Sequence, residues 1–404
     1  MSTNSSNKIG VATAVIIGMN AMIGAGIFSI ASLLSSKVGP AGILTYLFAF
    51  AAVWFMAKSL ARVAYLYPQE GSFYAYAKQW GGQTLGLLSA GAYLVGLLIA
   101  MGLLCKQAGL YLHEIFPAVP AYNLGLITLA LLVIGNIMGL VLSQVGQYIL
   151  IVCTVFPLIT TTIMCLSKLD FANLTPFMPY GPLNILDATK TAIFGLFGFE
   201  CTASLFNIVQ NPEKNLPKAL TYSLLLVGFI YLLFISSIIL SIPLVTFTAN
   251  PNITIPEALR TIFPHNNFIL QCVRLSILSA IVGTVHSMIW SSSELMLSYF
   301  KFMNIPSLNK AISNHLVTQK TTVLICGSVI LSSYVFISNA DMFFSLTAVT
   351  IIFALITSMI PLLKLKSEWE SGQNVATILG IITALVIFTV AIKAVAQHVM
   401  TVIG

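Results

Sequence analysis

Long apolar runs, separated by short polar or proline-containing breaks, make up most of the chain. Each run is close to the roughly 20 residues that a helix needs to cross about 30 Å of hydrocarbon. A transmembrane barrel would show short alternating segments instead. The pattern predicts an all-α polytopic membrane protein with about eleven transmembrane helices, at residues 9–35, 41–66, 84–112, 122–142, 145–167, 186–208, 218–243, 267–299, 320–338, 342–363 and 374–400.

Composition supports this prediction and excludes other classes of protein. Of the 404 residues, 58% are hydrophobic and 7% are charged, against about 45–50% and about 25% in an ordinary soluble domain. A soluble enzyme, a disordered chain and a nucleic-acid-binding protein are therefore excluded. The six cysteines form no CxxC pair, so we expect neither a zinc site nor a disulfide framework. No cofactor or metal is predicted.

Basic residues indicate how the chain lies in the membrane, because cytoplasmic loops collect Lys and Arg. With the N-terminus inside, eleven Lys and Arg residues fall at inner loops and helix ends and seven at outer ones. This predicts a multi-pass protein of the cell membrane with a cytoplasmic N-terminus. Arg274 and Lys106 are expected to extend toward the membrane surface. His113 and Glu114 are expected in an exposed outer loop.

Two glycine-rich segments, Gly18–Phe28 and Ala192–Glu200, predict helices that are interrupted inside the membrane. Glycine tolerates unusual dihedral angles, and unwound backbone is acceptable at membrane depth only where protein or a polar cavity receives it. The glycines could instead serve close helix packing. However, the two segments fall in predicted helices one and six, the spacing of a five-plus-five inverted repeat. We therefore expect one transmembrane domain over 1–404, with repeats at 9–167 and 186–363 and an extra helix at 374–400.

Four short motifs follow one another along the chain: Gly24-Ala25-Gly26-Ile27-Phe28, residues 68–76, Phe197-Gly198-Phe199-Glu200 and residues 211–219. Together they resemble motifs of the amino acid–polyamine–organocation (APC) transporter superfamily. The first resembles its GxGIF-type helix break and the second its P-x-x-G-x-x-Y-x-Y loop. The third is similar to its GFE motif and the fourth to its NPxxxxPxA loop. The stretch 293–306 is a weaker match. The resemblance covers about residues 8–310 and implies a secondary amino acid transporter.

Three departures from the superfamily pattern concern coupling and topology. Many members carry a lysine in helix five, near the position of Thr154 here. Glu294 stands where an arginine is common. Members often have twelve transmembrane helices, whereas the apolar runs here predict eleven. Proton symport, sodium symport and exchange with a counter-substrate therefore all stay open.

The two predicted breaks form the candidate binding site. Free N–H groups at a half-helix start can hold a carboxylate, and unwound carbonyls can hold an ammonium group. An aromatic lid near Phe194 is implied by the resemblance. The candidate binding residues are Met22, Ile23, Gly24, Ala25, Gly26, Phe194, Gly195, Phe197 and Gly198.

Glu200 and His286 are the candidate coupling or gating residues. A carboxylate inside a membrane is costly and is functional by default, and histidine is the side chain that most readily changes charge near neutral pH. Both have plain structural alternatives, as a satisfied acid beside unwound backbone and as a hydrogen-bonded core residue. The leading hypothesis is a transporter of amino acids or related amines that works by alternating access. The alternatives are an intramembrane enzyme using Glu200 and His286, and a channel or sensor.

Overall fold

The computed structural model describes residues 8–24, 26–67, 72–139, 144–202, 209–251, 253–364 and 371–403. These residues are overwhelmingly helical, as predicted; their one β-type pairing is the isolated parallel bridge between Ile9 and Val209. The principal helices are α1 (Val11–Met22), α2 (Gly26–Val38), α3 (Gly42–Leu66), α4 (Ser72–His113), α5 (Ala121–Ile137), α6 (Gln144–Leu166), α7 (Pro182–Phe194), α8 (Pro212–Ser241), α11 (Asn267–Met303), α13 (Gln319–Phe336), α14 (Ala340–Met359) and α16 (Ser371–Ile403).

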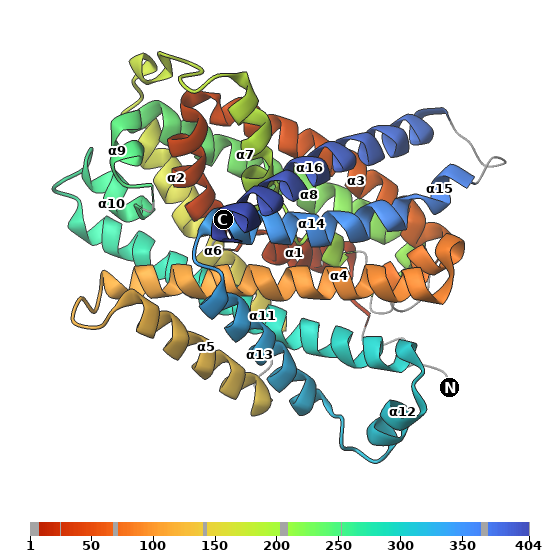
Figure 1. Cartoon of the computed structure of the whole chain (residues 1–404). Helices are drawn as coiled ribbons and strands as arrows, with labels where there is room; N and C mark the ends of the chain where they lie inside the picture. The colour runs from red at the N-terminus through yellow and green to blue at the C-terminus, as the bar shows by residue number, and fades with distance from the viewer. Residues whose placement is uncertain are drawn as a thin grey trace.

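Short helices occupy the connections between the long ones. Figure 1 shows α9 and α10 at one end of the molecule and α12 at the other. The short helices are η2 (Gly39–Ala41), η3 (Phe171–Leu174), α9 (Leu244–Ala249), α10 (Ile255–Arg260), α12 (Pro306–Ser313) and α15 (Pro361–Lys364).

Seven helical stretches among the described residues are long and apolar enough to cross a membrane. The chain is thus a multi-pass membrane protein. Shorter apolar helices cover Val11–Met22, Ala121–Ile137 and Ile151–Leu166, and helices overlap each of the eleven predicted ranges. The count of eleven crossings stays a prediction. The seven stretches are Gly26–Leu66, Ser72–His113, Pro212–Ser241, Asn267–Met303, Gln319–Phe336, Ala340–Leu363 and Asn374–Thr401.

The longest helix, α4, is the central element of the bundle (Figure 1). It packs against α14, α5, α11 and α13, while α3 packs against α16, α8 and α7. Gly82, at φ 71°, interrupts α4 near its start and separates a short first segment from the long one. A side chain other than glycine rarely adopts this dihedral, so the change of direction there depends on Gly82.

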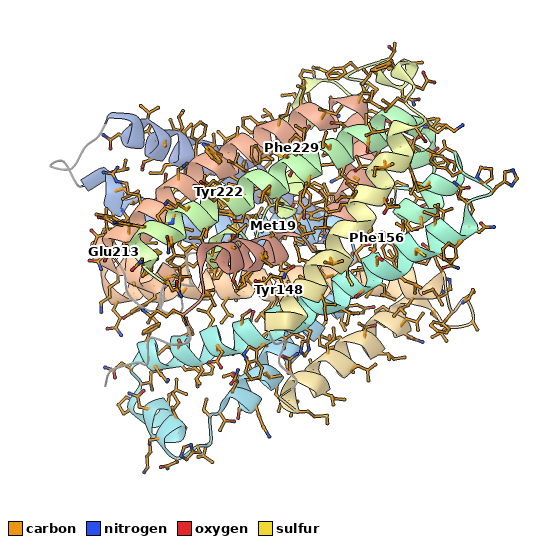
Figure 2. The ribbon with its side chains drawn as sticks, turned by 180° about the vertical axis from the view of Figure 1, so that it is seen from behind. Met19, Tyr148, Phe156, Glu213, Tyr222 and Phe229 are labelled. Carbon is orange, nitrogen blue, oxygen red and sulfur yellow. The ribbon has the colours of Figure 1, made fainter. Side chains whose placement is uncertain are left out.

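Large apolar side chains also cover the outside of the bundle. Figure 2 shows Tyr222 and Phe229 on α8 and Tyr148 and Phe156 on α6, on either side of α1. Between 43% and 62% of each of these four residues is exposed. Exposed apolar surface on this scale suits a hydrocarbon environment, where no water has to be excluded from it. The buried core, by contrast, lies where α2, α3, α4, α7, α8, α11 and α14 meet.

Candidate functional site

The first predicted break is present in the structure. Helix α1 ends at Met22, and α2 begins at Gly26. Between them Ile23 leaves the helical region, at φ −79° and ψ 80°. The amide of Gly24 donates to the carbonyl of Met22, only two residues back, at 2.9 Å. The helix is therefore interrupted where the glycines predicted it; Ala25 lies outside the described residues.

The second predicted segment also departs from α-helix. Helix α7 ends at Phe194, residues 195–198 form turns, and 199–202 form a 3-10 stretch. Gly198 has φ +106°, a conformation that L side chains rarely adopt. The part of the predicted helix that follows, at 203–208, lies outside the described residues.

The two breaks lie directly against each other. A Cβ built on Gly198 would sit 2.2 Å from the carbonyl oxygen of Ala21, in the last turn of α1. A Cβ on Gly26 would sit 3.1 Å from Cε1 of Phe194. Each of these glycines therefore has its Cα in contact with the opposite break. The aromatic ring of Phe194 covers the start of α2.

The main-chain groups at the first break are the carbonyls at the end of α1 and the amides at the start of α2. The hydroxyl of Tyr231, on α8, donates to the carbonyl of Met22 at 3.0 Å, which holds the end of α1 in place. The first amides of α2, beginning at Gly26, have no hydrogen-bond partner within their own helix. The start of a helix carries a partial positive charge. This end of α2 can accordingly receive a carboxylate.

Buried polar side chains surround the breaks. Glu200 is 1% exposed, and its Oε2 accepts a hydrogen bond from the amide of Gly198 at 2.9 Å. Its Oε1 is buried without a hydrogen-bond partner in the described part of the chain, as are Thr202 Oγ1 and Thr284 Oγ1. Thr284, on α11, contacts Gly24: a Cβ there would lie 3.2 Å from its methyl group. Unpaired polar groups are costly in a protein interior, so this neighbourhood suits a polar ligand.

Glu200 is also linked to the first segment of α4. The hydroxyl of Tyr93 lies 3.4 Å from Cys201 Sγ and close to the Glu200 carboxylate. The ring of Phe73 packs on Tyr93 with centroids 4.2 Å apart. Phe73 belongs to the predicted loop motif at 68–76, of which residues 68–71 lie outside the described residues. Tyr93 thus connects Phe73, at the start of α4, to the neighbourhood of Glu200.

The structure separates His286 from the break. His286 and Thr284 are two positions apart on α11, which places them on nearly opposite sides of a helix with 3.6 residues per turn. Thr284 faces Gly24, whereas the ring of His286 lies 3.0 Å from Asn136 Nδ2 on α5. Of the predicted site residues that the structure describes, those at the two breaks and Glu200 are brought together. His286 lies instead where α11 contacts α5.

Two expectations about charged residues were wrong. Arg274 is 4% exposed rather than extended to the surface, and its Nη2 lies 2.5 Å from the carboxylate of Glu114. Glu114 therefore lies in a largely buried ion pair and not in an exposed loop, and it also accepts a hydrogen bond from Thr254. Burial raises the pKa of the Glu114 carboxyl, while Thr254 and the charge of Arg274 oppose that rise. The pairing could not be predicted from the sequence because Arg274 and Glu114 lie far apart along the chain.

Sequence patterns also missed a charge network beside the site. Asp341, at the start of α14, forms ion pairs with Lys37 of α2 and, at 3.3 Å, with Lys190 of α7. The side chain of Lys190 is 1% exposed, and its Nζ also lies 2.5 Å from Asp187. Lysine inside a predicted apolar helix was a usable signal, because such a charge needs a partner.

The chain matches a known protein family over nearly its whole length. The profile of the family described as "Amino acid permease" matches residues 13–404. The chain belongs to the amino acid permease family. This membership agrees with the APC resemblance and identifies a membrane transporter of amino acids. It favours transport over the enzyme alternative.

Individual relatives of this permease are distant. It is 23% identical over 335 residues to the gamma-aminobutyric acid permease of Escherichia coli, covering 77% of the chain and 69% of that protein. It is 25% identical over 313 residues to a probable GABA permease of Pseudomonas aeruginosa, covering 72% and 63%. It is 23% identical over 244 residues to the branched-chain amino acid permease BcaP of Bacillus subtilis, covering 55% and 52%. The permease thus matches between about half and about two thirds of these relatives' lengths.

Proposed function

We propose that this permease is a secondary active transporter that binds an amino acid or related amine between its two broken helices. The carboxylate would meet the first amides of α2, from Gly26 onward, with Gly24 and Ala25 beside them. The ammonium group would meet carbonyls near Met22 and Ile23 and along Phe194–Phe197. The observation that carries this proposal is the contact of Gly198 with Ala21 and of Gly26 with Phe194.

Alternating access would come from movement of one group of helices against the rest. The group α1, α2, α3, α7 and α8 is supported by mutual packing of α1 with α8, α3 with α8, α3 with α7 and α2 with α7. The parallel bridge of Ile9 to Val209 further ties the N-terminal segment to the segment before α8. A set of elements so joined is suited to move as one body.

The finer topology forms part of the same proposal. It comprises eleven crossings, a repeat over 9–167, an inverted repeat over 186–363 and an extra helix at 374–400. The N-terminus would be cytoplasmic and the membrane that of the cell. The interruption after Met22 and the turn at 195–198 support corresponding positions in two halves.

Coupling would depend on Glu200. A buried carboxylate whose Oε2 accepts the Gly198 amide can alter the conformation of the second break when its charge changes. This suits proton coupling, and in exchange the same carboxylate would act as a gate. His286 would act only indirectly, through the contact of α11 with α5 at Asn136.

Proteoliposome uptake tests the proposed function. The purified full chain would be assayed with radiolabelled γ-aminobutyrate, branched-chain amino acids, other amino acids and polyamines, with and without a pH gradient and with internal counter-substrate. Saturable uptake that requires a gradient or counter-substrate is expected. Absence of uptake across the panel would reject the proposal; flux without saturation would indicate a channel, and chemical conversion in detergent an enzyme.

A further inference from the structure

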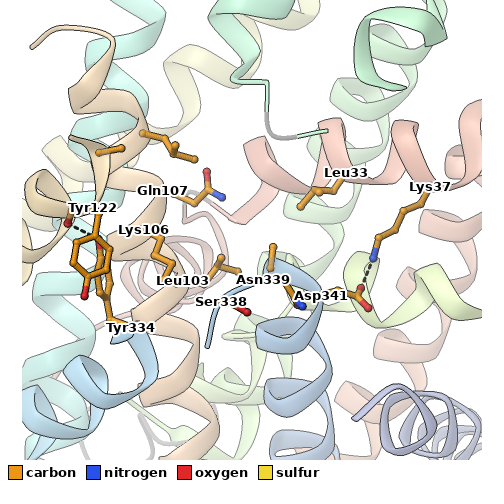
Figure 3. A pocket seen from close by; sticks show the side chains of 13 residues that line it. Leu33, Lys37, Leu103, Lys106, Gln107, Tyr122, Tyr334, Ser338, Asn339 and Asp341 are labelled. Atoms are coloured by element: carbon orange, nitrogen blue, oxygen red, sulfur yellow. Dashed lines mark hydrogen bonds and ion pairs between the residues drawn. The ribbon is translucent and has the colours of Figure 1, made fainter. Parts of the chain in front are cut away.

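A cavity of about 460 Å³ lies at the end of α2, away from α1. Its walls come from α2, α4, α5, the end of α13 and the start of α14 (Figure 3). The volume is within the range of roughly 300–1,000 Å³ typical of small-molecule sites. We name it the Lys106 cavity, and the lining residues that matter here are Leu33, Lys37, Leu103, Lys106, Tyr334 and Asp341.

Lys106 brings a positive charge into this cavity and forms no ion pair with any described residue. Its Nζ donates to the carbonyl of Ile337 at 2.5 Å and lies 5.4 Å and 5.3 Å from the ring centroids of Tyr334 and Phe343. Among the described residues, no carboxylate lies within ion-pairing distance of it. An ammonium group has three donors, so Lys106 keeps donors for a carboxylate from outside.

Asp341 supplies the opposite charge at another side of the cavity. Its side chain is 41% exposed, and its carboxylate forms ion pairs with two lysines, Lys37 and Lys190. Figure 3 shows Lys37 and Asp341 joined at one side and Lys106 nearer the tyrosines. Apolar side chains of Leu33 and Leu103 line the same space. A ligand with a carboxylate at one end, an ammonium group at the other and a short apolar stem would match this arrangement.

The cavity adjoins the proposed central site through one aromatic pair. Phe194, whose ring covers Gly26, meets Phe344 of α14 edge to face, with centroids 4.9 Å apart. Phe344 lies one turn along α14 from Asp341, which lines the cavity. Helix α2 likewise runs from Gly26 at the break to Lys37 at the cavity. A solute leaving the cavity toward the break would therefore pass Phe194 and Phe344.

We infer that the Lys106 cavity is a second binding site for small amino acid zwitterions, distinct from the site at the breaks. Lys106 Nζ binds the carboxylate, and Asp341 binds the ammonium group in competition with Lys37. The inference rests on the proposed function insofar as the ligand is of the class that the permease transports. Under the predicted orientation, the cavity faces the outside and holds the solute before Phe194 moves.

Protection of an introduced cysteine tests this site without requiring transport. Ser338 is exposed and lines the cavity, whereas the native cysteines are buried or half-buried. In the purified full-length Ser338→Cys variant, the rate of maleimide modification would be measured against γ-aminobutyrate, butyrate and n-butylamine. We expect γ-aminobutyrate to protect most, butyrate less and n-butylamine not at all. Equal protection by butyrate and γ-aminobutyrate would reject the role of Asp341.

Variants in the Ser338→Cys background identify the group that binds the carboxylate. Lys106→Gln should raise the concentration for half-protection roughly tenfold or more, the effect of losing one charge-assisted hydrogen bond. Lys106→Arg, which keeps the charge, should retain protection. Lys168→Gln removes an exposed positive charge away from the cavity and should change nothing. Unchanged protection in Lys106→Gln would overturn the inference.

A substitution at the breaks separates the two sites. Gly26→Val, which would obstruct the proposed central site, should leave protection of Ser338→Cys intact; its loss would mean that protection reports the central site and would overturn the inference. If the Gly26→Val variant fails to fold, the comparison of protection in Lys106→Gln and Lys106→Arg still tests the second site. Protection without any amino acid uptake would reject the proposed transport alone. Uptake without protection would reject the second site alone.

Discussion

The Cα of Gly198 lies against the main-chain carbonyl of Ala21, so closely that a Cβ at position 198 would come within 2.2 Å of the oxygen. This contact joins the two interrupted segments, which are far apart in the sequence. There are two reasons why position 198 requires glycine: its φ is +106°, and the carbonyl of Ala21 leaves no space for a Cβ. The proposed binding site depends on this approach of two backbones.

Gly198→Ala is expected to destabilise the permease and abolish uptake. Backbone strain at positive φ costs about 1–3 kcal/mol, and the clash with Ala21 adds to it. Gly181→Ala is the matched control, because Gly181 has φ +83° with nothing within 4 Å of its Cβ position. The thermal unfolding temperature in detergent should therefore fall further for Gly198→Ala than for Gly181→Ala. Equal losses would mean that the contact with Ala21 is unimportant.

Gly26→Val is expected to reduce uptake by at least roughly tenfold while the protein still inserts, since overpacking a fitted site costs about 1–3 kcal/mol. Its Cβ would lie 3.1 Å from Phe194, leaving no room for the added methyl groups. Gly10→Val, where nothing lies within 4 Å, should transport normally. Proteoliposome uptake, normalised to inserted protein, is the measurement. Normal uptake by Gly26→Val would count against binding at the breaks.

Glu200→Gln is expected to flatten the pH dependence of the initial uptake rate, because the amide retains the size of the side chain but cannot gain or lose a proton. Glu294→Gln serves as the control: Glu294 is an exposed acid on α11 and should keep the parental profile. The rates would be compared across pH with a fixed gradient. An unchanged profile in Glu200→Gln would remove this carboxylate from proton coupling.

Arg274→Met is expected to lower the free energy of unfolding by about 3–5 kcal/mol, because it leaves the Glu114 carboxylate buried without its partner. The exposed fractions of the two side chains, 5% and 12%, place the pair among buried ones. The double variant Arg274→Met/Glu114→Leu should recover most of the loss. Denaturation in detergent measures all three proteins. A double variant as unstable as Arg274→Met alone would contradict this account.

The apolar runs were sufficient to predict a helical membrane protein, and local chemistry marked where two of its helices would break. Both results follow from short stretches of chain: hydrocarbon requires every backbone group to be paired, and glycine permits the exceptions. The motif at 24–28 and the Phe197–Glu200 motif also resembled the superfamily to which the permease belongs. The positions of Gly198 and Gly26 at the two interruptions could be predicted for the same reason.

Contacts between distant segments could not be predicted in this way. The sequence does not indicate that Arg274 would find Glu114, that Asp341 would join Lys37 to Lys190, or that His286 would face α5 and not the break. Nor does it indicate that Lys106 would line a cavity with no carboxylate of the described residues within ion-pairing distance of it. Each depends on how helices are rotated and stacked. That arrangement is determined by packing across the whole bundle, which one-dimensional periodicity does not specify.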